Sequence, residues 1–285
     1  AAKKAIVDWL LRRHNWQIKA EWIVWTPGVV TAFNDICKTF CLDGDKVLVQ
    51  KPNYAPVLEA PGKNNLILDT VDTHLENGRW TLNMDEFEMK AKDIKTKLFI
   101  LCNPMNPCGS VFTKEELQQI EAICIDYNVM LCSDEIHCDL ILDEDIKHIP
   151  AGSLTKIGAQ SITLMAASKT FNVAGLATAF AIIPDSKNRQ DFQKSIATQL
   201  WVNALGITAT EKAFTLCDDW YAAQLEYLRA NRDYLVSAMS ELQGFDYMPS
   251  AATYLAWIDA SSLAVKDVHR YLLSKGIATS SGRDF

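Results

Sequence analysis

The chain has 285 residues, of which 49% are hydrophobic, with a formal net charge of −7 and a pI near 5.3. No apolar run reaches the length of a bilayer, so we expect a soluble globular protein with neither a membrane span nor a secretory leader. The acidic balance and the lack of a basic cluster argue against nucleic acid as a partner.

Short apolar runs alternate with longer amphipathic stretches, which is the pattern of parallel βαβ units. A helix is predicted over 113–128, because Thr113 can cap it and Glu116, three residues on, completes a capping box. The predicted strands of this region lie at 47–50, 97–102, 129–133, 162–166 and 178–183.

The pattern becomes helical from about residue 186, and a small α+β region follows, with 252–259 as its clearest strand. The length fits two domains. We predict boundaries of 1–190 for the larger domain and 191–285 for linking helices and a smaller one.

The stretch TPGVVTAFNDICKTF (26–40) reads as a Thr-Pro-Gly turn that opens a helix. Free backbone N–H groups near Gly28, Val29 and Val30 can hold an anion such as phosphate. Many helices begin after Pro-Gly without a ligand, so this stretch alone does not decide between structure and binding.

Two loops follow predicted strands and carry polar or aromatic groups. Tyr54, in KPNYAP (51–56), is either a core ring or a stacking platform. The stretch CNPMNPCG (102–109) has two Asn-Pro steps, which fix a turn and aim amides such as Asn106 beyond the sheet. Turn formation alone would also explain these prolines.

In SDEIHCDL (133–140), Asp134 comes just past an apolar strand and His137 stands three residues on. An acid at this point is either a helix cap or the partner of a cationic ring. In SKTFNVAGL (168–176), Lys169 follows another buried strand, at the sheet edge where open α/β folds place ligands. Such an amine is either a nucleophile toward carbonyl carbon or a lysine with a structural partner.

The eight cysteines form no C-x-x-C pair, so the sequence predicts neither a zinc site nor a redox dithiol. Several lie in apolar runs where free thiols pack as small hydrophobes. Reduced thiols indicate a cytoplasmic protein. The cysteines are at positions 37, 41, 102, 108, 124, 132, 138 and 217.

Asn106, Asp134 and Lys169, the last following the aspartate by 35 positions, resemble the signature of fold type I enzymes that use pyridoxal 5′-phosphate. More narrowly, the chain is similar to the cystathionine β-lyase, or C–S lyase, branch of the class I/II aminotransferase-like group. The resemblance extends over essentially the whole chain and implies an α/β fold, with a mainly parallel sheet sandwiched by helices and a smaller α+β C-terminal domain. The stretches that carry the branch are RRHNWQI (12–18), EWIVWTPGVV (21–30), SDEIHCDL and SKTFNVAGL.

The resemblance implies a role for each residue. Lys169 would bind the cofactor covalently and then move the proton taken from the substrate Cα. Asp134 would pair with the pyridine nitrogen and keep it protonated, which lets the ring accept electrons. Asn106 would donate to the phenolate oxygen, and His137 stands where many relatives have a tyrosine that does likewise. Tyr54 would stack on the ring.

The cofactor phosphate would be bound by the backbone of Gly28 and Val29 together with the Ser168 hydroxyl, and no metal is implied. The chain departs from the family pattern here. Relatives often have a threonine four residues before the lysine and a proline two before it, whereas this chain has Met165 and Ala167. One phosphate contact is therefore expected to be missing.

Two further departures concern the substrate. Ala55 replaces the usual second aromatic residue after Tyr54, which is expected to widen the pocket. No arginine of this chain can be assigned to the substrate carboxylate. The family's arginine is expected beyond SSGRDF (280–285), and relatives carry a substantial segment before the first residue.

The resemblance also implies a homodimer with active sites at its interface. Four tryptophans near the start of the chain offer aromatic surface of the kind enriched at interfaces, although any one of them can equally be core. They are Trp9, Trp16, Trp22 and Trp25.

Three hypotheses remain open for the activity. The first is a lyase acting on sulfur amino acids, which releases a thiol, pyruvate and ammonia. The second is an amino acid aminotransferase, which shares the early steps. The third is a non-catalytic protein that keeps the fold, and the combination of Lys169, Asp134 and Asn106 argues against it. Only the resemblance to the lyase branch separates the first two.

Overall fold

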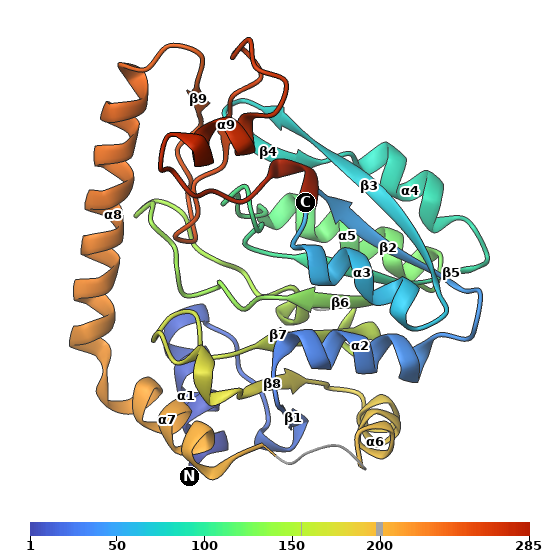
Figure 1. The fold of residues 1–285 in the computed structure, drawn as a ribbon. Helices are drawn as coiled ribbons and strands as arrows, with labels where there is room; N and C mark the ends of the chain where they lie inside the picture. The colour runs from blue at the N-terminus through green and yellow to red at the C-terminus, as the bar shows by residue number, and fades with distance from the viewer. Residues whose placement is uncertain (155, 198–201) are drawn as a thin grey trace.

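An eight-stranded sheet runs through the computed structural model, which describes residues 1–154, 156–197 and 202–285 (Figure 1). Its strands are β1 (Ile23–Thr26), β2 (Lys46–Lys51), β3 (Ile67–Glu76), β4 (Arg79–Leu82), β5 (Thr96–Cys102), β6 (Met130–Asp134), β7 (Ser161–Met165) and β8 (Ala179–Ile182). The helices are α1 (Ala2–His14), α2 (Val29–Phe40), α3 (Ala55–Lys63), α4 (Met84–Ala91), α5 (Lys114–Asp126), α6 (Ser186–Ser195), α7 (Ala204–Leu216), α8 (Asp218–Ser240) and α9 (Val268–Ser274). Two short strands, β9 (Asp246–Tyr247) and β10 (Ile258–Asp259), pair to form a separate two-stranded sheet.

The strand order is β1-β8-β7-β6-β5-β2-β3-β4. The central neighbours β7, β6, β5, β2 and β3 are parallel, whereas β1–β8, β8–β7 and β3–β4 pair antiparallel. The predicted, mainly parallel α/β sheet is thus confirmed. All five strands predicted for this region form, as β2, β5, β6, β7 and β8.

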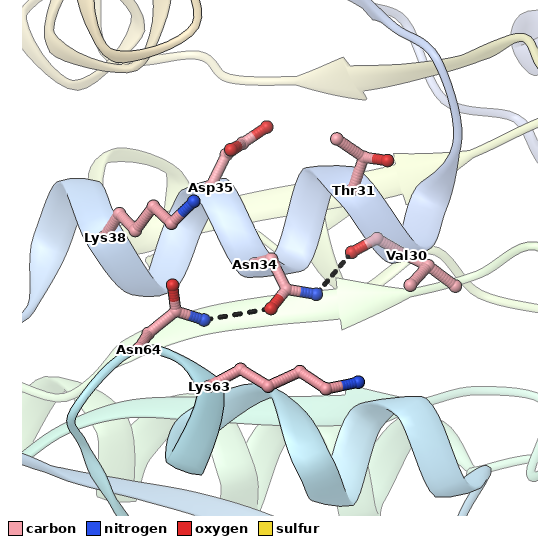
Figure 2. Close-up of a pocket in the computed structure, with 7 residues that line it drawn as sticks. All are labelled: Val30, Thr31, Asn34, Asp35, Lys38, Lys63 and Asn64. Atoms are coloured by element: carbon pink, nitrogen blue, oxygen red, sulfur yellow. Dashed lines mark hydrogen bonds between the residues drawn. The ribbon is translucent and has the colours of Figure 1, made fainter.

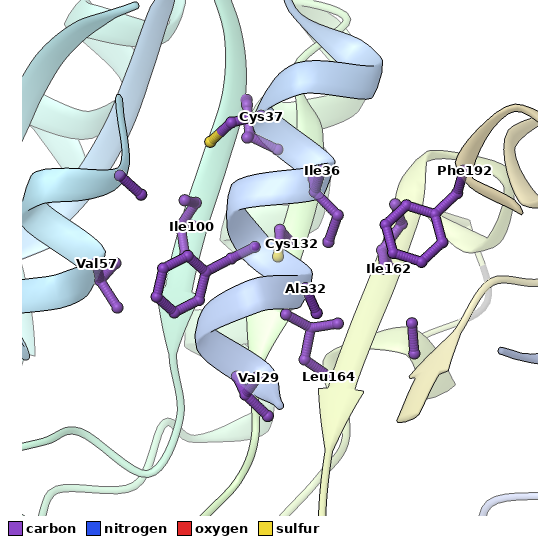
Figure 3. Packing of buried hydrophobic residues seen from close by; sticks show 14 of the residues in the cluster. Val29, Ala32, Ile36, Cys37, Val57, Ile100, Cys132, Ile162, Leu164 and Phe192 are labelled. Atoms are coloured by element: carbon purple, nitrogen blue, oxygen red, sulfur yellow. The ribbon is translucent and has the colours of Figure 1, made fainter. Parts of the chain in front are cut away.

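Helices cover both faces of the sheet (Figure 1). In β2, Val47 and Val49 enter the core under α2 and α3, and Leu48, between them, enters the core with α4 and α5. This alternation is what a strand buried on both faces requires. Figure 3 shows the first of these cores, in which Ala32 and Ile36 of α2 lie over the sheet.

The predicted helix 113–128 is confirmed as α5 and begins with the expected capping box. The Glu116 backbone N–H donates to Thr113 Oγ1 over 3.2 Å, and the Thr113 N–H donates to Glu116 Oε2 over 2.7 Å. Two N–H groups that no helical carbonyl can reach are satisfied in this way.

The predicted strand 252–259 is wrong for most of its length, because only Ile258–Asp259 is extended in a ladder. The Ala252 N–H donates to Gly109 O and the Thr253 N–H donates to Leu140 O, so this backbone is committed to two loops. Thr253 also has a left-handed φ of 71°, which interrupts a strand.

The N-terminal tryptophans are divided between core and partly covered positions. Trp9 and Trp16 are buried, at 1% and 5% exposure, whereas Trp22 and Trp25 are only partly covered. Trp9 and Trp16 are therefore core residues of the chain itself. Among the helices that the structure describes, none combines the length and the apolar character needed to cross a membrane.

Candidate active site

The register of the sheet brings four strand ends to one edge. Val24 pairs with Ala181, Ala181 with Leu164, Leu164 with Asp134 and Asp134 with Cys102, so the five residues form one row across the sheet. Since β1 and β7 both run antiparallel to β8, the strands β1, β5, β6 and β7 all point the same way. The loops that leave them meet at the edge where open α/β sheets bind ligands.

Lys169 lies in the turn that leaves β7 and is partly buried. Its amine forms no hydrogen bond or ion pair with any residue that the structure describes. Its positive charge acts on both Asp134 and His137, which places the three groups close to one another. The structural alternative, a lysine at a strand end with a satisfied partner, therefore finds no support in these contacts.

Asp134 is the last residue of β6 and is 5% exposed. The pKa of its carboxyl is raised to about 7, mainly by burial. A hydrogen bond from the Ile136 N–H (3.1 Å) and the charge of Lys169 lower this pKa, and the neighbouring charge of Glu135 raises it. The hydrogen bond from Ile136 is a local turn contact, and no α-helix begins here. A buried acid of this kind accepts a cationic partner readily, because the partner restores the stability of its charge.

His137 is buried beside these groups at 3% exposure. Burial, and secondarily the charge of Lys169, lowers the pKa of its imidazole to about 3, so the ring is neutral at physiological pH. Its Nδ1 has no hydrogen-bond partner among the described residues. The ring of Tyr254 packs edge-on against it, with centroids 5.7 Å apart.

The Asn-Pro loop after β5 contributes two amides with open hydrogen-bonding positions. Asn103 accepts from the Phe112 N–H through Oδ1, but its Nδ2 is buried without a partner. One amide atom of Asn106, assigned as Oδ1, is likewise buried without a partner. Since an amide can turn by 180° about its Cβ–Cγ bond, this position can hold either a donor or an acceptor.

The remaining predicted residues lie around the same edge. Gly28 is the N-cap of α2 and no side chain caps this helix, so the first N–H groups near Val29 stay available to an anion. Tyr54 follows β2 and is 41% exposed, so it is not a core ring. Ser168 precedes the lysine and is partly buried, and its carbonyl accepts from the Val173 N–H.

Two cavities lie elsewhere, and Val30 is the one residue named for the predicted site that lines either of them. One, of about 370 Å³, lies between α2 and α3, where Asn64 donates to Asn34 and Asn34 donates to the Val30 carbonyl (Figure 2). The other, of about 1260 Å³, is lined by Asp139 and His148 among others. The site at the sheet edge is therefore defined by the chemistry of its residues.

A second polar group, here called the histidine cluster, consists of His14, Glu135, Asp139 and His148. His14 Nε2 lies 2.8 Å from Asp139 Oδ1, and His148 Nε2 lies 2.7 Å from Glu135 Oε2. Burial lowers the pKa of His14, but the hydrogen bond and charge of Asp139 outweigh it and leave the pKa raised. Trp9 Nε1 also donates to Asp139, so this carboxylate is well satisfied by protein groups.

The chemistry of the sheet edge fits pyridoxal 5′-phosphate. The cofactor has a basic ring nitrogen, a phenolate oxygen, a phosphate and an aldehyde, and the edge offers an acid, unpartnered polar atoms, free helix N–H groups and a free amine. In particular, buried polar atoms without a partner are rare in proteins, and several gathered at one edge indicate a ligand.

Sequence reasoning missed several residues of this edge. Asn53 follows β2 and Thr170 follows the lysine, and each has a buried polar atom without a partner. Asn103 was recognised only as part of a turn. Tyr254 could not be placed from the sequence, because it reaches His137 only through the docking of residues 250–253 on the Asn-Pro loop.

Comparison with known proteins agrees with this geometry. Residues 1–285 match the family "Aminotransferase class I and II". Cystathionine beta-lyase PatB of Bacillus subtilis (strain 168) is 35% identical over 280 residues, which cover 96% of this chain and 72% of that protein. The chain thus belongs to the class I and II aminotransferase family.

Two solved structures extend the comparison. A PLP-bound putative aminotransferase from Clostridium difficile 630 is 36% identical, with a TM-score of 0.95, and the match covers 99% of this chain and 74% of that one. Cystalysin from Treponema denticola, which contains a pyridoxal 5′-phosphate cofactor, is 31% identical with a TM-score of 0.95, over 99% of this chain and 73% of that one.

Proposed function

We propose that the chain is a pyridoxal 5′-phosphate-dependent C–S β-lyase, which converts cystathionine or a related cysteine-like amino acid into a thiol, pyruvate and ammonia. The observation that carries this proposal is the unpaired amine of Lys169 beside the buried carboxyl of Asp134, at the edge where four strands end. The similarity to a cystathionine beta-lyase favours this activity within the family.

Lys169 has two tasks. Its Nζ would hold the cofactor covalently and, when not so bound, would take the proton from the substrate Cα. The cofactor, when bound, supplies an electron sink for the pair left on Cα. The partly buried position of the amine excludes much of the water that would compete for this proton.

Asp134 holds the charge of the ring nitrogen. In the protein alone its carboxyl keeps a proton up to a pH of about 7, because burial penalises the ionised form. Beside a cationic ring nitrogen, the ionised carboxylate of Asp134 would be the favoured form, because the opposite charge would offset that penalty. The buried position makes the pair stronger than it would be in water.

The other residues orient the cofactor. Asn106 and His137 each have a buried polar atom free for the phenolate oxygen, and His137 is neutral and can donate through one ring nitrogen. The phosphate is held by the N–H groups at Gly28 and Val29 and by the Ser168 hydroxyl. Tyr54, exposed at the edge, supplies the stacking ring.

The second candidate is an amino acid aminotransferase, favoured by the similarity to a putative aminotransferase. Incubating the protein with cofactor and cystathionine, with and without an α-keto acid, separates the two. We expect pyruvate and thiol in both samples. Amino transfer that depends on the keto acid, without thiol release, would instead identify an aminotransferase.

Three predictions about the chain as a whole go with this proposal. The homodimer rests on the family resemblance and on the partly covered Trp22 and Trp25, since Trp9 and Trp16 are core residues. A fully active monomer in sedimentation at micromolar concentration would contradict it. A cytoplasmic location is supported by eight free cysteines. The domain division at 190/191 stays a prediction, which limited proteolysis can test.

A further inference from the structure

Glu135 directly follows Asp134 and is completely buried, yet it has no part in the chemistry described above. Its Oε1 accepts from Ser133 Oγ and from the Ala151 N–H, each over 2.8 Å. Its Oε2 lies 2.7 Å from His148 Nε2. These contacts tie the end of β6 to the segment that contains His148 and Ala151.

The backbone on either side of this point is also held. The Glu135 N–H donates to Leu164 O of β7 over 2.9 Å, and the Asn103 N–H donates to Asp134 O over 3.0 Å. Consecutive side chains at the end of a strand point to opposite sides. Anchoring Glu135 on one side therefore fixes the direction in which Asp134 projects on the other.

The charges on the two sides differ. Asp134 is influenced by Lys169 on its own side and by Glu135 behind it. Behind Glu135 lie His148 and, 5.4 Å from the His148 ring, His14 with its partner Asp139. The negative charge of Glu135 raises the pKa of Asp134, although burial is the larger cause.

We propose that Glu135, held in place by His148, is a positioning residue for Asp134. Glu135 directs the Asp134 carboxyl toward the site and adds negative charge behind it. This inference rests on the proposed function, in which Asp134 faces the cofactor ring nitrogen. Negative charge behind Asp134 favours a proton on whatever group Asp134 pairs with. Glu135 would thereby help to keep that nitrogen cationic without touching the cofactor.

The test is an infrared titration of the Asp134 carboxyl in the cofactor-free full chain, with the band assigned by its loss in Asp134→Asn. Glu135→Gln keeps the shape of the side chain and an acceptor for Ser133 and Ala151, but removes the charge. We expect the titration midpoint of Asp134 to fall by about one pH unit. His148→Gln, which keeps the Glu135 carboxylate and offers an amide donor, is the matched control, and its midpoint should not fall.

An unchanged midpoint in Glu135→Gln, or an equal fall in both variants, would overturn the role of the charge. Glu135→Asp addresses position and covers the case in which Glu135→Gln does not fold. It keeps the charge but shortens the side chain, so we expect little change in midpoint and about tenfold weaker cofactor binding. Wild-type cofactor affinity in this variant would overturn the positioning role.

The titration needs no cofactor, so the two proposals fail separately. A wild-type protein that binds no pyridoxal phosphate would overturn the proposed function and leave the midpoint shift measurable. A normal enzyme with unshifted midpoints would overturn only the role of Glu135.

Discussion

The sheet-edge site and the histidine cluster lie on either side of the Asp134–Glu135 peptide. Their polar groups differ in how completely they are hydrogen-bonded. In the cluster, Glu135 accepts three hydrogen bonds and Asp139 is bonded by His14 and Trp9. At the edge, buried polar atoms of Asn103, Asn106, His137 and Thr170 have no partner among the described residues.

Polar groups with hydrogen-bond partners in the protein stabilise the fold, whereas buried polar groups without partners are suited to bind a ligand. A buried polar atom without a partner costs about 1–3 kcal/mol, so several of them at one edge are tolerated only where binding removes the cost. The histidine cluster has one such atom, His148 Nδ1, and is otherwise paired. We therefore expect changes at the edge to affect cofactor binding and turnover. Changes in the cluster should affect stability, except at Glu135, which also positions Asp134.

The largest effect is expected for Lys169→Ala. Loss of the amine removes both the covalent bond to the cofactor and the group that takes the Cα proton, so activity should fall by roughly 10³-fold or more. Borohydride reduction followed by mass spectrometry should find no cofactor attached at this position. Lys187→Ala, at an exposed lysine of α6, is the control and should leave both measurements unchanged.

Asp134→Asn is expected to have the next largest effect. It keeps the size and hydrogen-bonding reach of the side chain but removes the charge that holds the ring nitrogen protonated. The activation free energy of turnover should rise by several kcal/mol, where about 1.4 kcal/mol corresponds to a tenfold lower rate, while the cofactor still binds detectably. Near wild-type cleavage would instead favour a purely structural role, because asparagine can make the same local turn contact with Ile136.

Features that depend on residues near one another in sequence were predictable, whereas features that depend on contacts between distant segments were not. The five predicted strands, the capped helix α5 and the places of Asp134 and Lys169 depend on local patterns and on the rule that parallel strand ends meet. Tyr254 and the failed strand at 252–259 depend instead on contacts between distant segments, such as the bond from the Ala252 N–H to Gly109 O. No local propensity encodes such contacts.

The histidine cluster escaped prediction for a similar reason. His14 and Asp139 are 125 residues apart in sequence, and His148 and Glu135 lie in a loop without a regular pattern. The dimer also stays a prediction, because a buried tryptophan such as Trp9 and an interface tryptophan look the same in sequence.

The pH dependence of stability offers a third test of the edge. The pKa of Asp134 is raised to about 7 in the folded protein from an ordinary 3.8. Between these two pH values the folded state binds more protons than the unfolded state, so the contribution of Asp134 to stability falls as pH rises. His137 has a lowered pKa of about 3 against 6.5, so the unfolded state binds more protons and its contribution rises with pH. From about pH 4 to 6.5 the two slopes oppose each other.

Single substitutions should separate these slopes in cofactor-free protein. Relative to wild type, the free energy of unfolding of Asp134→Asn should rise more steeply with pH, by up to roughly 1.4 kcal/mol per pH unit. His137→Asn should change the slope in the opposite direction. Urea unfolding at several pH values between 4.5 and 6.5 measures both, and parallel slopes in the two variants would contradict the burial of these groups.

Gly109→Ala should destabilise the docking of the C-terminal segment on the Asn-Pro loop. A Cβ at this position would lie 2.5 Å from Ser250 Cβ and 2.7 Å from Ala252 O, and φ is 69°. We expect a loss of about 2–4 kcal/mol in urea unfolding. Gly44→Ala is the control, because φ is 84° there but the space is open, so about 1 kcal/mol should be lost. Equal losses would show that the contact with Ser250 does not matter.

Trp9→Phe should have the smallest effect and should act on stability alone. The indole Nε1 donates to both oxygens of Asp139, over 3.2 and 3.1 Å, and its ring stacks on Phe214 at 4.7 Å. Phenylalanine keeps most of the stacking but leaves Asp139 to His14 and its other neighbours, so the free energy of unfolding should fall by about 1–2 kcal/mol.

The corresponding control is Trp22→Phe, since Trp22 is only partly covered and its indole N–H donates to no described residue. It should cost less than Trp9→Phe. Cofactor affinity should stay within about twofold of wild type in both variants, because neither tryptophan is bonded to a residue of the sheet edge. A tenfold loss of affinity in Trp9→Phe at unchanged stability would place the histidine cluster within the site. The distinction between the two regions would then have to be abandoned, because the paired groups of the cluster would serve the cofactor as directly as the unpaired groups of the edge.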